Sequence, residues 1–136
     1  MRWLLPLVAG VALLVPLAVS AETAGPLLRV LDGDTYEIML EGFPTRVRLA
    51  NADTPETGSR AKCAQDLDWG NRATDFVRAE VSRGAVAVLP TGRLDKYRRV
   101  LVHVTIDGED LGGLLVKNEL ARWYGGERRL GWCGER

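Results

Sequence analysis

The chain has 136 residues and equal numbers of basic and acidic side chains, so its formal net charge is zero. This length suits one domain with a hydrophobic core and is too short for two. The apolar share of 46% and the charged share of 26% are ordinary for a globular protein and argue against a disordered chain. A neutral chain lacks the overall positive charge that drives non-specific binding to nucleic acid. Any such attraction must come from local basic clusters, such as Arg46 with Arg48 and residues 96–99.

Residues 1–21 differ in composition from the rest of the chain. Arg2 is followed by an apolar run that ends in Val19-Ser20-Ala21. A positive start, an apolar stretch and a small-residue exit are typical of an export signal. We therefore expect a cleaved signal peptide at 1–21 and a mature domain at 22–136, either periplasmic or secreted and with no stable membrane insertion. An uncleaved anchor helix is the alternative, but the run is slightly short for a bilayer and contains two prolines.

The first part of the mature chain contains three strand patterns joined by turn sequences. Residues 27–31 are typical of a strand, and apolar and polar residues alternate along 35–40 and 45–50. Asp32-Gly33 and the segment 41–44 are the turn signals between them. In the third strand, Val47 and Leu49 are expected on one face, with Arg46 and Arg48 on the other. Residues 51–61 are polar and are expected to form a loop.

The second part of the chain begins with a change of period. Residues 65–83 carry apolar side chains at helical spacing, and strand patterns follow at 85–89 and 100–106. Asp110 can cap a second helix that turns Leu111, Leu114, Leu115 and Leu120 inward. Five short antiparallel strands with a helix after the third favour a Greek-key barrel of the oligonucleotide-binding (OB) type. We therefore predict an α+β fold, mainly β, with two packed helices.

The mature chain contains two cysteines, Cys63 and Cys133. In a chain bound for an oxidising compartment, a disulfide between them is the expected state. It would close a loop of about seventy residues, worth about 4 kcal/mol on the chain-entropy model. Two free thiols are the alternative.

Three charged clusters stand at turns of the predicted barrel. They are Asp32-Gly33-Asp34-Thr35, Asp53-Thr54-Pro55-Glu56-Thr57 and Asp95-Lys96-Tyr97-Arg98-Arg99. Taken singly, the first cluster is better explained as a hairpin turn. The second is explained equally well as a helix start or solvated loop, and the third as a charged turn.

A barrel brings these three clusters close together, and their side chains then form a chemically coherent set. Asp34 and Asp53 supply two hard carboxylate oxygens, to which Ca²⁺ is suited. Glu56 lies on the same loop as Asp53 and can accept a proton from a nearby water as general base. Arg48 and Arg99 offer forked donors that match phosphate oxygens. Such a combination of carboxylates, a metal ion and arginines is suited to the attack of a water molecule on a phosphodiester.

The ordered set of motifs resembles the thermonuclease (micrococcal or staphylococcal-type nuclease) family. The segments that carry the resemblance are residues 30–35, 48–49, 53–57 and 95–99, and the match runs from about Leu27 to Ala121. Each motif alone is weak, whereas the ordered set is specific. The resemblance implies an OB-like barrel and calcium-dependent cleavage of DNA and RNA to 3′-phosphate ends.

The resemblance also implies a set of metal-binding residues. Asp34 and Asp53 would bind Ca²⁺ through their side chains, and Thr54 would bind it through its carbonyl oxygen. Asp32 would hold calcium-bound water without touching the ion.

The remaining implied roles concern the substrate. Glu56 would be the general base, while Arg48 and Arg99 would orient the phosphate and stabilise the transition state. Lys96 and Tyr97 would contact a terminal phosphate of the bound strand.

Three features depart from the family pattern. Arg98 stands where the family usually has glycine, and the loop after Glu56 carries Cys63. The base-stacking tyrosines of the family follow the second helix, where Trp123-Tyr124 is the nearest aromatic pair, displaced in register. These two rings either stack on bases or cap the barrel core.

Two other functions are compatible with the fold. One is a non-catalytic OB module that binds single-stranded nucleic acid in the cell envelope, and the other is a structural envelope domain. Degenerate relatives would lose the acids or arginines first, whereas this chain keeps all of them. We expect a monomer with a DNA or RNA substrate and no obligate protein partner.

Overall fold

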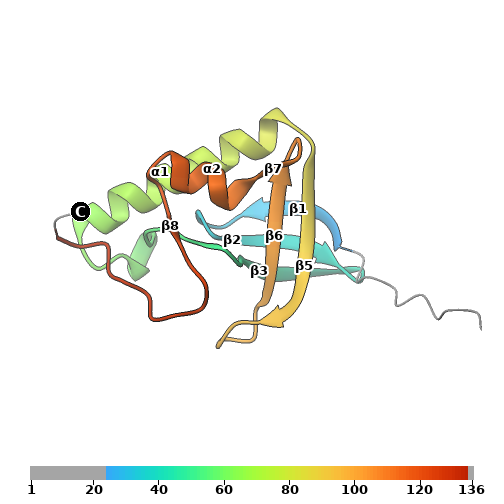
Figure 1. Ribbon diagram of the computed structural model, residues 1–136, viewed down its shortest axis with the longest axis horizontal. Coiled ribbons are helices and arrows are strands. Elements are labelled where there is room, and N and C mark those ends of the chain that lie inside the picture. Colours follow the sequence, from blue (N-terminus) through green and yellow to red (C-terminus); the bar gives the residue numbers. More distant parts are fainter. Residues whose placement is uncertain (1–23, 135–136) are drawn as a thin grey trace, which may run out of the picture.

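A computed structural model of the chain describes residues 24–134, so the expected signal peptide at 1–21 lies outside the described residues. Five strands follow one another across the main sheet in the order β1-β2-β3-β6-β5. Their bounds are β1 Ala24–Val30, β2 Thr35–Leu40, β3 Phe43–Leu49, β5 Val86–Leu94 and β6 Val100–Ile106. The sheet curls until its outer strands β1 and β5 come into contact, which gives a partly closed barrel (Figure 1). The predicted α+β, OB-like fold is confirmed.

Two helices lie together along one side of the barrel (Figure 1). They are α1 (Ala64–Arg83) and α2 (Leu111–Lys117). Asp110 caps α2 as predicted, because its carboxylate accepts a hydrogen bond from the backbone N–H of Gly113 at 2.7 Å. Neither helix of the region 24–134 combines the length and apolar character needed to cross a membrane.

Short elements complete the fold around the barrel. Strand β7 (Glu109–Asp110) pairs with the end of β6, and β4 (Ala52–Asp53) pairs with β8 (Arg122–Trp123). A 3-10 helix, η1 (Gly58–Arg60), precedes α1. The β4–β8 pair joins the loop after β3 to the chain that follows α2.

Several predicted boundaries were wrong. The turn before β3 is confined to Glu41-Gly42, both with positive φ, and Phe43 already belongs to β3. Strand β5 continues past Pro90 to Leu94, which is possible because β5 is the outer strand of its sheet. The expected loop at 51–61 contains β4 and η1, and α2 ends three residues before the buried Leu120.

The expectation that all five strands are antiparallel is wrong for one pair. Strands β3 and β6 run parallel, with Val47 opposite Val100 and Leu49 opposite Val102. A parallel neighbour needs a long crossover, which α1 and β5 provide here. Local alternation cannot reveal this arrangement, because it depends on the path of the chain between the two strands.

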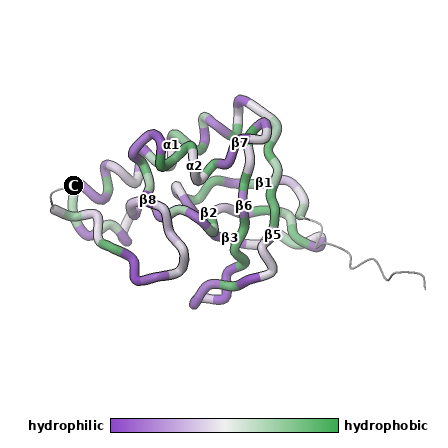
Figure 2. The backbone as a smooth tube through the Cα atoms, in the orientation of Figure 1, coloured by the Kyte–Doolittle hydropathy of each residue, from purple (hydrophilic) through white to green (hydrophobic). Residues whose placement is uncertain are grey.

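The core is formed by inward side chains of β2, β3 and β6 together with apolar residues of both helices. Figure 2 shows hydrophobic residues along these strands and hydrophilic residues at the tip of the β5–β6 hairpin. Arg48 breaks the predicted alternation, since it lies between buried Val47 and Leu49 and is itself only 3% exposed. The outward face of β3 is therefore covered at Arg48, and the groups that cover it form the candidate site.

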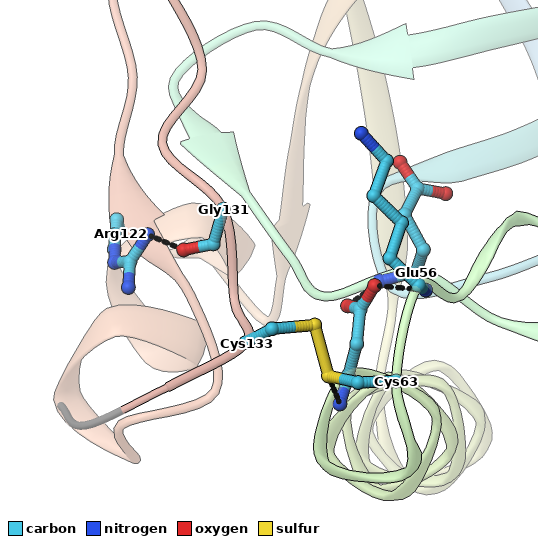
Figure 3. The surroundings of a disulfide bond; sticks show 7 residues. Glu56, Cys63, Arg122, Gly131 and Cys133 are labelled. Carbon is cyan, nitrogen blue, oxygen red and sulfur yellow. Dashed lines mark hydrogen bonds between the residues drawn. A yellow bond between two sulfur atoms is a disulfide. The ribbon is translucent and has the colours of Figure 1, made fainter.

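The predicted disulfide between Cys63 and Cys133 is confirmed (Figure 3). It joins the residue that caps the start of α1 to the C-terminal segment, by which we mean residues 124–133. The alternative of two free thiols is excluded, because neither cysteine is free.

Gly70 allows α1 to touch the loop that carries Glu56. A Cβ atom at Gly70 would lie 2.1 Å from the carbonyl oxygen of Glu56, whereas one at Gly113 in α2 would meet no atom closer than 3.4 Å. We predict that Gly70→Ala lowers the free energy of unfolding by about 1–3 kcal/mol through this overlap, although alanine is the better helix former. Gly113→Ala should leave it unchanged or raise it. Urea unfolding of both variants tests this; equal stabilisation by both would contradict the close approach.

Candidate active site

The turn between β1 and β2 carries two buried carboxylates. The backbone N–H of Asp34 donates to Asp32 Oδ1 at 3.1 Å, and the Tyr36 hydroxyl donates to the carbonyl oxygen of Gly33 at 2.6 Å. Gly33 is required for packing, because a Cβ there would lie 2.7 Å from Thr54 Oγ1. The turn is thus pressed against the loop that follows β4.

Arg48 of β3 connects the two carboxylates that the sequence assigns to a metal site. Its Nη2 lies 3.3 Å from Asp34 Oδ2 and 2.9 Å from Asp53 Oδ1, and its Nη1 donates to the carbonyl oxygen of Leu49 at 3.0 Å. The Tyr124 ring covers the guanidinium, with 4.9 Å between Cζ and the ring centroid. Since one nitrogen reaches both carboxylates, Asp34 and Asp53 converge on a common point.

Asp53 ends β4 and is held by groups from distant parts of the chain. Besides Arg48, Arg129 Nε lies 2.5 Å from its Oδ1, and the Trp132 Nε1–H donates to its Oδ2 at 3.4 Å. The backbone N–H of the next residue, Thr54, donates to Asp34 Oδ2 at 2.9 Å. These contacts place Asp53 and Thr54 beside the β1–β2 turn, as the sequence predicts.

Glu56 is held through both its backbone and its carboxylate. Its N–H donates to Asp66 Oδ1 at 2.8 Å, and Asp66 Oδ2 accepts from the Lys62 N–H, so one buried acid of α1 shapes the whole loop. Glu56 Oε2 lies 3.1 Å from Arg60 Nε, and Oε1 lies 2.9 Å from Arg129 Nη2. Arg60 also pairs with Asp32. Glu56 therefore joins the same network of charges as the β1–β2 turn.

The turn between β5 and β6 positions Arg99. Asp95 accepts hydrogen bonds from the N–H groups of Tyr97 and Arg99 and pairs with Arg99 Nε at 2.6 Å. Arg99 Nη1 reaches Thr35 Oγ1 at 3.5 Å, which directs the guanidinium toward the acidic turn. Arg98 has a φ of 64°, the left-handed region that favours glycine. The turn therefore has the backbone expected where the family pattern has glycine.

Two pockets lie at this site and share the side chains of Tyr97, Arg99 and Arg129. The first has a volume of about 240 Å³ and is also lined by Arg48. The second has a volume of about 300 Å³ and is also lined by Glu56. The three charged clusters of the sequence thus meet at one concave surface, which is the size and chemistry of a site for an anionic ligand.

A family model described as "Staphylococcal nuclease homologue" matches residues 46–130, which is more than half of the chain. The chain belongs to the staphylococcal nuclease family. The resemblance drawn from the motifs is thereby confirmed. The matched range contains Arg48, Asp53, Glu56 and Arg99, while Asp32 and Asp34 lie just before it.

The chain is also similar to curated proteins that are named as nucleases. The chain is 35% identical to "Endonuclease YncB" of Bacillus subtilis over 96 residues, which is 69% of this chain and 44% of that protein. It is 34% identical to an "Uncharacterized endonuclease" of Escherichia coli over 105 residues, 76% of this chain and 63% of that protein. It is 36% identical to "Thermonuclease" of Staphylococcus intermedius over 95 residues, 69% of this chain and 55% of that protein. The matched part spans about half the length of these relatives.

The acids of this nuclease-family site are strongly affected by burial. Burial, and next the charge of Asp34, raise the pKa of Asp32 from 3.8 to about 6. Burial also raises the pKa of Asp53, although Arg129 opposes this. Burial alone would lower the pKa of Arg129, but Asp53, Asp34 and Glu56 together raise it above its usual range. The site therefore contains carboxylates that lack full compensation for their burial.

The donor set of the site fits a calcium ion. Asp34 and Asp53 converge on Arg48 Nη2, so a calcium ion would have to bind beside this nitrogen or displace it. The charge of such an ion would offset the burial that raises the pKa of Asp53. Thr54 Oγ1 is buried beside them and has no hydrogen-bond partner among residues 24–134. Across the same described residues, no three carboxylate, imidazole or thiolate groups gather around one point. Two carboxylates and a backbone carbonyl make a sparse oxygen site, which suits Ca²⁺ with its flexible, water-completed shell.

Of the aromatic residues named from the sequence, Tyr97 and Tyr124 line the first pocket and Trp123 does not. The Tyr97 ring is 67% exposed, with Lys96 Nζ 5.1 Å and Arg99 Cζ 5.5 Å from its centroid. Tyr124 lines the pocket against Arg48, whereas Trp123 is 60% exposed and does not cap the core.

Three residues of the charge network were not found by sequence reasoning: Arg60, Arg129 and Trp132. Each stands within four positions of Cys63 or Cys133. A predicted disulfide brings the neighbours of both cysteines together, so the pairing itself was the signal that pointed to them.

Proposed function

We propose that the protein is an exported, calcium-dependent nuclease that hydrolyses phosphodiester bonds of DNA or RNA and leaves 3′-phosphate ends. One observation carries this proposal: Arg48 lies between Asp34 and Asp53, and the pockets beside it also expose Glu56 and Arg99. Membership of the staphylococcal nuclease family and relatives named as endonucleases support it. The disulfide supports export, because such bonds persist in oxidising compartments.

Asp34, Asp53 and the carbonyl oxygen of Thr54 would hold the calcium ion, and Asp32 would hold a water beside it. The ion, when bound, supplies positive charge that neutralises the phosphate and favours attack on it. Asp34 and Thr54 are already fixed relative to each other by the hydrogen bond between the Thr54 N–H and Asp34 Oδ2. Asp34 and Asp53 also contact Arg48 Nη2, so this guanidinium would shift toward the phosphate when the cation binds.

Glu56 would accept the proton of the attacking water. The water oxygen forms a bond to phosphorus while the bond from phosphorus to the 5′ oxygen breaks, and the leaving oxygen takes up a proton. The products are a 3′-phosphate and a 5′-hydroxyl. The ordered backbone of Glu56, tied to Asp66 of α1, supports a role that requires a fixed distance between base and phosphate.

Arg48 and Arg99 would bind the scissile phosphate from two sides. Guanidinium groups stay charged and offer paired donors, so they stabilise charge that grows on phosphate oxygens in the transition state. Lys96 and Tyr97 would contact a terminal phosphate, and the Tyr124 ring would support a base or sugar in the first pocket. The position of all these side chains around that pocket supports these roles.

Calcium dependence tests the metal residues. We predict that purified residues 22–136 cleave single-stranded DNA with Ca²⁺ and not in chelator, and that Mg²⁺ does not restore cleavage because the site is sparse and flexible. The Asp53→Asn variant should imitate calcium removal with its circular dichroism spectrum unchanged. Full cleavage in chelator would refute the metal assignment. Binding of single strands without any cleavage would instead support a non-catalytic OB module.

The adjacent pair Arg98 and Arg99 tests the phosphate clamp. Arg99 lines both pockets, whereas Arg98 occupies a left-handed turn position. We predict that Arg99→Gly lowers turnover by about 10²–10³, as for loss of a donor to a developing oxyanion. Arg98→Gly should keep turnover near wild type and relieve its backbone strain, so its melting temperature should not fall. If Arg98→Gly is the inactive variant, the clamp has been assigned to the wrong residue of the pair.

A further inference from the structure

Both carboxylate oxygens of Glu56 are held by arginines that have no assigned role. Arg60 Nε lies 3.1 Å from Oε2, and Arg129 Nη2 lies 2.9 Å from Oε1. The two arginines reach Glu56 from different parts of the chain, sixty-nine positions apart in sequence. Glu56 is therefore gripped on both sides.

Each arginine is also anchored to a buried aspartate of the site. Arg60 pairs with Asp32, and Arg129 Nε lies 2.5 Å from Asp53 Oδ1. Arg129 thus uses one guanidinium nitrogen for Asp53 and another for Glu56. Such a two-acid bridge fixes the position of one carboxylate relative to the other, which a single ion pair would not do.

The two segments that carry these arginines are joined covalently. Arg60 ends η1 and stands three residues before Cys63, while Arg129 stands four residues before Cys133. Figure 3 shows Glu56 close to the disulfide between Cys63 and Cys133. The disulfide therefore joins the two segments whose arginines hold the Glu56 carboxylate.

The C-terminal segment is anchored to the site despite its lack of regular structure. At its start the Tyr124 N–H donates to the carbonyl oxygen of Asn51 at 3.0 Å. Near its end Trp132 donates to Asp53, and the Arg122 guanidinium stacks on the Trp132 ring at 3.8 Å from its centroid. In Figure 1 this segment runs from β8 down beside the barrel and back to the start of α1. Arg129 is presented from a loop that is fixed at both ends.

We propose that Arg60 and Arg129 are positioning residues for Glu56, and that the Cys63–Cys133 disulfide holds the segments that carry them. The inference rests on the proposed function, in which Glu56 is the general base. The reaction slows when the distance between the general base and the reacting water varies. Two guanidinium groups that hold the Glu56 carboxylate reduce that variation. Arg129 contacts Asp53 through Nε and Glu56 through Nη2, so two of its three nitrogens are directed at acids of the site.

Steady-state kinetics of four variants on single-stranded DNA with Ca²⁺ test the proposal. Arg129→Gln should lower kcat by about 10–10²-fold and leave KM within about twofold, the pattern of a misplaced catalytic group. Arg60→Gln should act in the same direction. Arg129→Lys, which keeps the charge, should recover part of the loss. Arg128→Gln, at the exposed neighbouring position, is the matched control and should change neither constant.

A double-mutant cycle separates positioning from a merely structural role. If Arg129 acts through Glu56, then Glu56→Gln combined with Arg129→Gln should be no slower than Glu56→Gln alone. Additive losses would overturn the proposal. So would a higher KM at unchanged kcat, which would make Arg129 a phosphate contact, or a higher kcat, which would make it an inhibitory plug. An active Glu56→Gln variant would refute the role of Glu56 as general base, and a wild-type protein without cleavage would refute the proposed function. An inactive Glu56→Gln beside a fully active Arg129→Gln would refute this inference alone.

The disulfide is tested with the double variant Cys63→Ser, Cys133→Ser, assayed below its own melting temperature. We expect kcat to fall while KM changes little, as in Arg129→Gln. A folded double variant with wild-type kcat would remove the disulfide from the proposal. If the double variant does not fold, Arg129→Gln and the cycle decide the role of the arginines.

Discussion

The buried contact of Arg48 with Asp34 and Asp53 is the interaction on which the rest of the site depends. Charged groups are costly to bury, and removal of one partner from a buried ion pair typically costs about 3–5 kcal/mol. The chain meets this cost with a network in which four carboxylates face three guanidinium groups: Asp32, Asp34, Asp53 and Glu56 with Arg48, Arg60 and Arg129. One negative charge is left over, so the network as a whole would attract a cation.

The barrel provides the rigid support that such a network needs. Strand β3 is fixed between β2 and β6, so Arg48 has one backbone position, and the β1–β2 and β5–β6 turns approach it from two sides. Helix α1 shapes the Glu56 loop through Asp66, and the close approach at Gly70 brings helix and loop together. The C-terminal segment then covers the remaining side of the site. Asp32, Asp53 and Glu56 each have an arginine partner from a distant part of the chain, Arg60 for Asp32 and Arg129 for the other two.

Much of the fold and of the candidate site could be predicted from the sequence, and the physical reason differs between the strands and the site residues. Strands 35–40 and 100–106 have their predicted bounds because one face of each is buried and alternation records that burial. The acids and Arg48 follow from ordered motifs at turns. The parallel β3–β6 pair depends on the crossing of the chain, and the contact of Arg129 with Glu56 joins distant segments. No local pattern encodes these contacts, although the two cysteines mark where they occur.

Urea unfolding measured in calcium and in chelator tests, without any assay of activity, whether the buried network binds a calcium ion at Asp34 and Asp53 as we propose. For a site with a dissociation constant near 10⁻⁴–10⁻³ M, about 10 mM Ca²⁺ should raise the free energy of unfolding by about 1–3 kcal/mol. The shift should disappear in Asp53→Asn and be smaller with Mg²⁺. Identical unfolding curves in calcium and chelator, or an equal calcium shift in Asp53→Asn, would contradict the account.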